Sequence, residues 1–563
     1  MNNERPLVLR ILKTALPFLL CLIVFLISYS SASHLPVLGD GSFHAYAIEE
    51  IATKGTAAID TEVYYPLFYH LFGALIYSLG GITAVKIIAP LMMALSALLI
   101  YLIAKELTKS KFVALTSIII IAFSSKVIWY GSQILMEPFM IFFVVAVTYA
   151  VLLLHKKQNI KTVIFTAILM GMAISTKQQA LFLIIAIPFF LLLNRMEIKK
   201  IAVLAGLTIL VALGPYLWLV STNGSLIQPS SCGSFFQRAP DSVIICLSES
   251  NSIADQIIFG IGDYQIPDWS RELEEESDGI DIYNRGTEEH EARHLYIWDM
   301  ANPIKFLWLN SLQTLHFWRG FTTPAHIIGF VLLQILLISG FLFSLGYSVK
   351  RKEWRIIPCV VFTSWLFTFW GSDSLRYFLH LPVLMGFLCL LPIKLTFDNF
   401  KLPQAKLMTV FMLIVILTVP PYVIRAGINE QAHVKELENT QCYASSEGGI
   451  SSIEETGKWL KEHTGRDDVV FGTSINEWTY YSGMEAFWDY RVYFLPPDRL
   501  DHYLKLWGVK YLLVRDNQIV SDDNWSHLEF YPRTFYENVQ TMYHSPVYIS
   551  SHGDIEVYEI DYS

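Results

Sequence analysis

The stretch that decides the fold is "ALPFLLCLIVFLISYSSASHLPVLGDGSFHAYAIEEIATKG", from Ala15 to Gly55. Its first half is an apolar run long enough to cross a bilayer core of about 30 Å, which takes about 20 helical residues. No small-residue cleavage site follows a short apolar core, so we expect a retained helix and not a cleaved signal peptide. Its second half presents Asp40, His44 and Glu49 soon after that helix. We therefore expect ionisable side chains close to the membrane surface.

The composition of the whole chain is that of a polytopic membrane protein. Of its 563 residues, 53% are apolar and 16% are charged, and the mean hydropathy is +0.42. The formal net charge of -9 argues against a nucleic-acid partner, because phosphate binding needs concentrated Lys and Arg. The sequence has no GxxxxGK[ST] loop, so no nucleotide cofactor is expected.

About eleven segments are long and apolar enough to span a membrane. Their centres carry almost no charged residues, each of which would cost roughly 2.5–3.5 kcal/mol there. Six basic clusters fall at alternate connections, which places the N-terminus in the cytoplasm. The predicted spans lie near 11–31, 86–105, 112–130, 137–154, 162–176, 179–194, 201–220, 325–348, 356–371, 375–393 and 407–424.

The same alternation predicts what lies outside. Tyr65–Gly81 is apolar but short, and counting it as a span would move later basic clusters outside, so we expect an interfacial helix. Residues 1–425 then form a transmembrane catalytic domain with outer loops 32–85 and 221–324. Residues 426–563 alternate helical and strand patterns, which indicates an extracytoplasmic α/β domain. The expected location is a multi-pass protein of a plasma membrane, of prokaryotic type.

The cysteines add one expectation. Cys232 and Cys246 share the long outer loop, where an oxidising environment favours a disulfide between them. Cys442 in the tail is left over and is a possible competitor for either.

Four ionisable side chains from four separate segments are expected at one depth on the outer face. Each has an ordinary local explanation, such as a helix cap for an acid or a snorkelling position for a lysine. Together they indicate a functional site, because ionisable groups at membrane depth are costly. Two cations suit a lipid-linked phosphate, and an acid suits removal of an acceptor proton. The four are Asp40 ("GDGSFHAY"), Glu137 ("LMEPFM"), Lys177 ("GMAISTK") and Arg376 ("LRYFLHLP").

The order of these motifs resembles the GT-C membrane glycosyltransferases, and within them the protein O-mannosyltransferase and aminoarabinose-transferase type. The resemblance covers the first ten spans and includes the Pro-Leu helix "YYPLFYHLFGALIYSLGG". It implies transfer of a sugar from a polyprenyl-phosphate donor to a protein, lipid or glycan acceptor. Asp40 is implied as the catalytic base and Glu137 as the second acid, and direct attack predicts inversion. The implied donor or acceptor contacts are His44, Tyr65, His70, Lys177, Arg376 and Tyr377.

The first outer loop departs from the pattern of many relatives, which carry two acids adjacent or one residue apart. Here Asp40 is followed by a glycine, a serine, a phenylalanine and then His44. A divalent metal ion held by Asp40, His44 and Glu137 remains an open expectation, since carboxylate and imidazole ligands suit such ions.

Two other functions remain as alternatives. A membrane transporter or flippase would show matching halves with Gly or Pro near the bilayer midplane, and the sequence shows no such repeat. "HEARH", His290 to His294, fits the HExxH pattern of zinc peptidases. It stands in an acidic stretch without an evident third ligand, so the peptidase is the less expected of the two.

Overall fold

The structure is a computed structural model of the whole chain. It describes residues 7–34, 37, 40–55, 66–122, 130–223, 324–367, 380–400, 449–465, 468–473, 475–487, 492–493, 495–520 and 531–562. The described residues form two compact units. The first unit contains α1, the C-terminal half of α2 and the helices from α3 to α20. The second unit contains the N-terminal half of α2 and the elements from α23 to β7.

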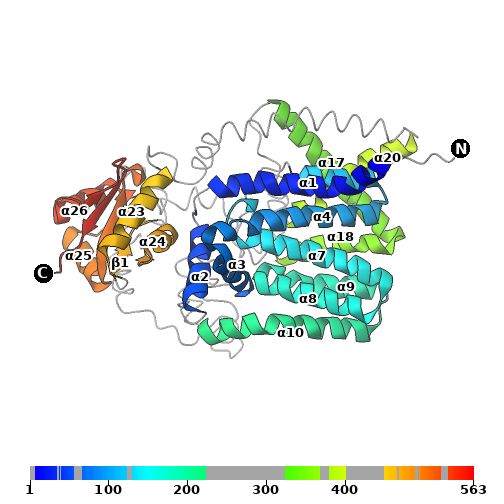
Figure 1. The fold of residues 1–563 in the computed structure, drawn as a ribbon, viewed down its shortest axis with the longest axis horizontal. Helices are drawn as coiled ribbons and strands as arrows, with labels where there is room; N and C mark the ends of the chain where they lie inside the picture. Colours follow the sequence, from blue (N-terminus) through cyan, green and yellow to red (C-terminus); the bar gives the residue numbers. More distant parts are fainter. Residues whose placement is uncertain are drawn as a thin grey trace, which may run out of the picture. The chain divides into compact units, whose positions relative to one another are not determined.

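The first unit is a bundle of apolar helices, several of which run side by side in one direction (Figure 1). Neighbouring pairs include α1 with α4, α4 with α7, α7 with α8 and α8 with α10. Among the described residues of this unit, three short helical turns connect longer helices: η2 (Gln178–Phe182), η3 (Lys352–Arg355) and η6 (Gly386–Cys389). The helices are α1 (Leu7–His34), α2 (Asp40–Lys54), α3 (Phe68–Val85), α4 (Ile88–Thr108), α5 (Lys111–Ala122), α7 (Met136–Lys157), α8 (Ile160–Thr176), α9 (Leu183–Leu193), α10 (Ile198–Asn223), α17 (Pro324–Lys350), α18 (Ile356–Phe367), α19 (His380–Met385) and α20 (Leu390–Asn399).

This unit has the apolar helices of a multi-pass membrane protein, as the composition predicted. Among the described residues, five helices are long and apolar enough to cross a membrane. Three shorter apolar helices accompany them, at Ile160–Thr176, Gln179–Leu193 and Ile335–Lys350. The five are Ala15–Ser33, Phe68–Val85, Ile88–Thr108, Met136–Lys157 and Ile198–Trp218.

α3 is the helix expected to lie on the membrane surface. By length and composition it also qualifies as a span. It contains a kink, however, where Gly80 and Gly81 leave helical geometry and Gly81 takes a φ of 63°. In Figure 1 it lies at one end of the bundle and does not run along α4 and α7. Its interfacial position stays a prediction.

Several predicted basic connections lie at one end of the bundle. Glu106, at the end of α4, forms ion pairs with Lys109 and with Lys156 at the end of α7, the latter at 2.5 Å. His155 of α7 packs edge-on against Phe190 of α9, which brings the end of α9 to the same place. Arg355 then donates to the Leu193 carbonyl at 2.7 Å. Clusters that the charge alternation put on one side of the membrane are therefore close in space.

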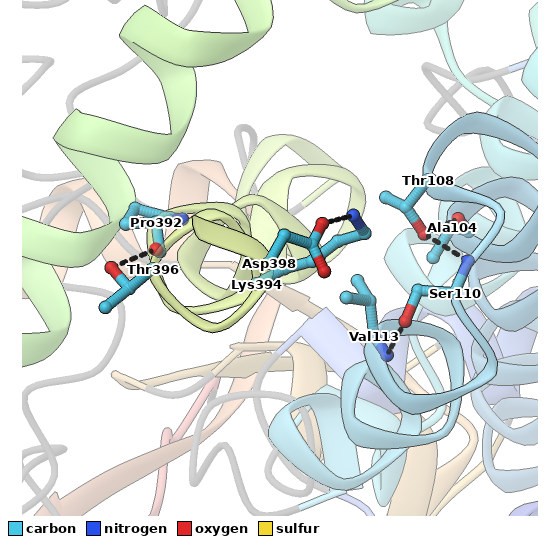
Figure 2. A network of polar contacts seen from close by, with 8 residues as sticks. All are labelled: Ala104, Thr108, Ser110, Val113, Pro392, Lys394, Thr396 and Asp398. Carbon is cyan, nitrogen blue, oxygen red and sulfur yellow. Dashed lines mark hydrogen bonds and ion pairs between the residues drawn. The ribbon is translucent and has the colours of Figure 1, made fainter. Parts of the chain in front are cut away.

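Figure 2 shows another part of this end, where α20 lies beside α5. Side-chain hydrogen bonds support the turn between α4 and α5: the Thr108 hydroxyl accepts from the Ser110 N–H at 3.2 Å and donates to the Ala104 carbonyl of the last turn of α4 at 2.6 Å. Ser110 caps α5 by accepting from the Val113 N–H at 3.3 Å. On α20, Lys394 pairs with Asp398 one turn later. Hydroxyl side chains thus satisfy backbone groups where α4 ends and α5 begins.

The second unit contains a five-stranded mixed sheet with strand order β2-β1-β3-β7-β6. β1 pairs in parallel with β2 and β3, and β7 pairs antiparallel with β3 and β6. One apolar cluster holds Trp478 of α24, and another holds Phe535 of α26. Alternate β3 residues enter the two clusters, so they lie on opposite faces of the sheet. The strands are β1 (Val469–Phe471), β2 (Glu485–Phe487), β3 (Val509–Arg515), β6 (Tyr548–Ile549) and β7 (Ile555–Glu559), and the helices are α23 (Gly449–His463), α24 (Ile475–Ser482), α25 (Pro497–Leu506) and α26 (Arg533–Tyr543).

These elements form where the sequence pattern of the tail alternates. The transition from α25 to β3 is made by Gly508, whose φ of 70° ends the helix in a conformation that favours glycine. A further pair of short parallel strands, β4 (Ile519–Val520) and β5 (Tyr531–Pro532), adjoins α26.

Candidate functional site

Glu137 lies in the first turn of α7, at the end of this helix opposite its basic last turn. Leu135 precedes the helix in extended conformation, and Pro138 follows Glu137 inside the first turn, where proline is tolerated. An acid at a helix N-terminus is favoured by the exposed N–H groups. That local effect alone would leave Glu137 at a surface, yet its exposed fraction is 1%.

Lys177 lies where α8 ends. The helix stops at Thr176, and Lys177 takes an extended backbone, with φ -155° and ψ 136°, before the short η2 turn leads into α9. α8 has 17 residues, so it is about 25 Å long at 1.5 Å per residue, shorter than a bilayer core of about 30 Å. α8 is therefore at the short end of the range for a helix that crosses a bilayer. Lys177 is 1% exposed.

Glu137 and Lys177 form a buried ion pair. The Nζ atom of Lys177 donates to Oε1 of Glu137 at 2.6 Å, and each side chain is 2% exposed. The residues are 40 positions apart and meet because α7 packs against α8. Removing two charges from water costs several kcal/mol per ion, and replacing such a pair by apolar side chains is often neutral or stabilising. A pair of this kind is weak evidence for stability and stronger evidence for a function.

The packing of α8 against α10 holds the lysine end in place. A Cβ atom on Gly171 would lie 2.5 Å from Cβ of Val211, so the two helices approach more closely than any larger residue allows. Closer to the break, the Tyr216 hydroxyl donates to the Ile174 carbonyl at 3.4 Å. Both contacts lie within two turns of Lys177, and they fix where its backbone leaves the helix.

α3 supplies an aromatic wall beside the start of α7. The ring of Tyr69 meets Phe139 edge-on at 5.6 Å, and Phe68 packs on both Phe139 and Phe143. His70, expected as a substrate contact, follows Tyr69 in the chain and is fully buried. α2 also packs against α3, where Ile48 fills the space left by Gly73.

A second buried polar contact lies next to the lysine turn. The Ser364 hydroxyl and Nε2 of His380 are 2.7 Å apart, and the His380 ring stacks on Phe182 with centroids 5.1 Å apart. Phe182 ends η2, five residues after Lys177. Sequence analysis missed this contact. The signal was present, because His380 stands in "LRYFLHLP", which was interpreted for its arginine and tyrosine only.

Asp40 and His44 lie on α2. Asp40 opens the helix in its first turn, as the sequence predicted, and His44 follows four residues later and is 3% exposed. Residues four apart share a helix face, so the carboxylate and the imidazole lie on one side of α2. Both belong to the second compact unit, whereas Glu137 and Lys177 belong to the first. That Asp40 and His44 act together with the ion pair is part of the proposal below.

The remaining expected residues lie outside the described residues. They are Tyr65, Arg376, Tyr377, Cys232 and Cys246, and the HExxH stretch from His290 to His294 lies outside as well. Within the described part of the chain, no three His, Cys, Asp or Glu side chains are grouped closely enough to hold a metal ion.

The central part of the first unit matches a known family. Residues 64–218 match the family model described as dolichyl-phosphate-mannose-protein mannosyltransferase. The matched range contains four of the expected site residues, Tyr65, His70, Glu137 and Lys177. No curated protein matches the chain.

Comparison with solved structures identifies proteins of similar fold. The archaeal oligosaccharyltransferase AglB from Archaeoglobus fulgidus, in complex with an inhibitory peptide and a dolichol-phosphate, superposes with a TM-score of 0.55 at 13% identity. The match covers 98% of this chain and 75% of that one. The same organism's oligosaccharyltransferase in complex with Zn and sulfate gives a TM-score of 0.55 at 14% identity, with 89% and 68% coverage.

A third structure, ArnT from Cupriavidus metallidurans bound to undecaprenyl phosphate, gives a TM-score of 0.44 at 10% identity, covering 97% of this chain and 98% of that one. The AglB superpositions show that the chain shares the fold of these oligosaccharyltransferases. The resemblance drawn from the sequence motifs is confirmed at the level of the fold and of the matched segment.

Proposed function

We propose that the protein is a glycosyltransferase that moves a sugar from a polyprenyl-phosphate donor to an acceptor on the outer membrane face. The observation that carries the proposal is the buried Glu137–Lys177 pair at the break between α8 and α9. It lies inside the segment that matches the mannosyltransferase family. The AglB structure with a dolichol-phosphate supports a lipid-phosphate donor. A protein acceptor is favoured by the family description and by the peptide bound to AglB.

The ion pair explains how such a site binds a phosphate reversibly. Lys177 is buried with Glu137 as its counter-ion, so the cation is stable inside the bundle before the donor arrives. A donor phosphate takes over as the anionic partner of the ammonium group, and Arg376 is the second cation proposed for the same phosphate. Glu137 then stays close by as a second acid.

Asp40 is the proposed general base. The acceptor hydroxyl or amide loses a proton to the Asp40 carboxylate as it attacks the sugar carbon bonded to the phosphate oxygen. The carbon–oxygen bond to the phosphate breaks, the lipid phosphate leaves, and the single displacement inverts the anomeric centre. The acceptor must lie within about 3 Å of the carboxylate for this transfer. His44, one helical turn from Asp40, and Tyr65, His70 and Tyr377 are proposed to position the donor and acceptor.

A divalent metal ion is a further part of the proposal. Asp40, His44 and Glu137 offer two carboxylates and one imidazole, a ligand set that suits such an ion. When bound, the ion would neutralise charge on the donor phosphate. The zinc in an oligosaccharyltransferase structure of the same fold supports testing this role.

The finer architecture is proposed from the sequence. It consists of eleven spans, a cytoplasmic N-terminus, a catalytic domain over 1–425 and an extracytoplasmic domain over 426–563, in a prokaryotic plasma membrane. A cysteine introduced at Gln540, labelled by an impermeant reagent on intact cells, tests the orientation, and protection would contradict it. A Cys232–Cys246 disulfide in the outer loop is proposed as well, and peptide mapping without reduction tests it.

The decisive assay is sugar transfer by the purified protein. A labelled polyprenyl-phosphate sugar and a peptide acceptor are supplied, and the labelled peptide is measured. Lys177→Met is expected to lower transfer strongly, and Lys394→Met, at the basic end of the bundle, serves as a matched control that retains it. A protein that moves labelled lipid across vesicles without forming product would be a flippase, and the proposal would be wrong.

A further inference from the structure

A cavity of about 400 Å³ lies between α9, α17 and α18. Its lining includes none of the residues proposed for transfer, and it lies at the basic end of the bundle. Its volume falls within the 300–1,000 Å³ typical of small-molecule sites. It is lined by Phe189, Leu193, Ser348, Val349, Arg355, Pro358, Cys359, Phe362 and Thr363.

Its walls are apolar and partly exposed. Phe189 on α9 is 49% exposed and Phe362 on α18 is 46% exposed. Val349, near the end of α17, is 78% exposed. Large apolar side chains exposed on membrane helices face the hydrocarbon, so the cavity opens toward lipid tails.

Arg355 forms the polar part of the lining. Its Nε atom donates to the Ser348 carbonyl at 3.1 Å, and Nη1 donates to the Leu193 carbonyl at 2.7 Å and to Oδ1 of Asn194 at 3.4 Å. These bonds fix the guanidinium between the ends of α9 and α17. A guanidinium has five N–H donors, and within the described part of the chain Nη2 makes no hydrogen bond. Two donors therefore remain for a ligand.

The surroundings of Arg355 are strongly basic. Asn194–Lys200 carries three Lys or Arg and one Glu, and Lys350–Arg355 carries four and one, which gives 7 − 2 = +5 over the two segments. Arg195 and Lys352 are exposed. Basic pockets between membrane helices attract lipids with anionic headgroups, and an arginine can bind a phosphate through two hydrogen bonds.

We propose that this cavity binds one anionic phospholipid, with an acyl chain along Phe189 and Phe362 and the phosphate on Nη2 of Arg355. The charge decides the class of lipid, because a zwitterionic headgroup gains less from a net positive surface. This lipid is not the sugar donor. Its site uses none of the residues proposed for transfer, so the test of the lipid site does not depend on the proposed function.

The test uses full-length protein in nanodiscs of phosphatidylcholine with about one fifth phosphatidylglycerol, a mixture in which anionic lipid is the minority. After release into the gas phase, native mass spectrometry counts the lipids retained. Wild type is expected to retain one phosphatidylglycerol per chain. Retention of the two lipids in the ratio in which they are supplied would overturn the proposal. This comparison needs no variant.

A variant pair locates the lipid. Leu193→Trp fills the cavity but keeps the backbone carbonyl that Arg355 binds, and it is expected to lower phosphatidylglycerol retention about tenfold, since several buried methylenes are displaced. Ile185→Trp, on the same helix, 51% exposed and outside the lining, is the control and should retain the lipid. Loss in both variants, or in neither, would contradict the assignment.

Discussion

The two compact units contain ion pairs of the same chemistry in opposite environments. In the helical unit, Lys177 and Glu137 pair at 2.6 Å with side chains 2% exposed. In the sheet unit, Lys510 and Asp468 pair at 2.9 Å with side chains 34% and 24% exposed. Forming the exposed pair requires little desolvation and changes the free energy of unfolding little. Burying the other pair has a large desolvation penalty, and removing one of its partners destabilises the protein more strongly. The exposed Lys510–Asp468 pair therefore indicates no function, whereas the buried Lys177–Glu137 pair indicates a functional site.

The largest expected effect comes from the acid proposed as base, compared with the exposed acid. Asp40→Asn keeps a helix-capping oxygen but cannot accept a proton, so transfer should fall roughly 10²–10⁴-fold. Asp468→Asn removes a carboxylate from the sheet unit and should leave the rate unchanged. The measurement is transfer from a polyprenyl-phosphate sugar at matched expression and melting temperature. If Asp40→Asn retains more than about half of the wild-type rate, Asp40 is a helix cap and the base is Glu137 or His44.

The next effect breaks the buried pair itself. Lys177→Met removes the cation that pairs with buried Glu137, which should lower the free energy of unfolding by about 3–5 kcal/mol. The double variant Glu137→Leu/Lys177→Met removes both charges and should recover most of that stability. Transfer should be strongly lowered in both. Thermal unfolding in detergent measures the stability.

The double variant is the informative one. Recovered stability without recovered transfer assigns the pair to function. Recovered transfer would show that the charges only support the packing of α7 on α8, and the proposed phosphate contact would be wrong.

A smaller effect is expected next to the lysine turn. Ser364→Ala removes a hydrogen-bond partner of buried His380 and should cost about 1–3 kcal/mol. Because His380 stacks on Phe182 at the end of η2, the apparent affinity for the donor should weaken while the maximal rate changes less. Ser348→Ala, at the far end of the bundle, is the control, since Arg355 contacts only its backbone carbonyl. Equal KM values for both variants would assign Ser364 to packing alone.

The smallest effect concerns the exposed pair. Lys510→Met should change the stability of the sheet unit by about 0.2–1 kcal/mol. Burial raises the pKa of Asp468, but hydrogen bonds from Lys510 and the Gly465 N–H, with the Lys510 charge, bring the net pKa below its usual value of 3.8. The contribution of this carboxylate is complete above about pH 4 and is lost as the pH falls through the lowered folded-state pKa.

Lys510 gives the opposite pH dependence, on the alkaline side. Its pKa is raised above 10.5, mainly by the hydrogen bond to Asp468, so its contribution is present below the unfolded value and lost as the pH rises through the raised one. Amide hydrogen exchange in β3 and β7 of the full-length protein, compared with Lys510→Met, measures the loss of this contribution at low pH and at high pH. A variant whose protection differs from wild type equally at every pH would contradict the assignment.

The sequence by itself determined the class of the molecule and many of its elements. Apolar runs predicted the helices, since hydrocarbon excludes charged side chains, and the alternation of basic connections predicted which helix ends lie together. The ends of α4, α7, α9 and α18 meet as that alternation requires. The position of Asp40 at the start of α2 agrees with the helix cap that the sequence offered for an acid there.

The tertiary structure decided which of these groups meet. Lys177 and Glu137 were each recognisable as unusual, but nothing local shows that they pair across 40 residues, because the pairing depends on how closely α7, α8 and α10 pack. The contact of Ser364 with His380 and the cavity beside Arg355 are also products of packing. Periodicity and composition act over one element at a time, whereas a site in a helical bundle is made where the ends of several elements converge.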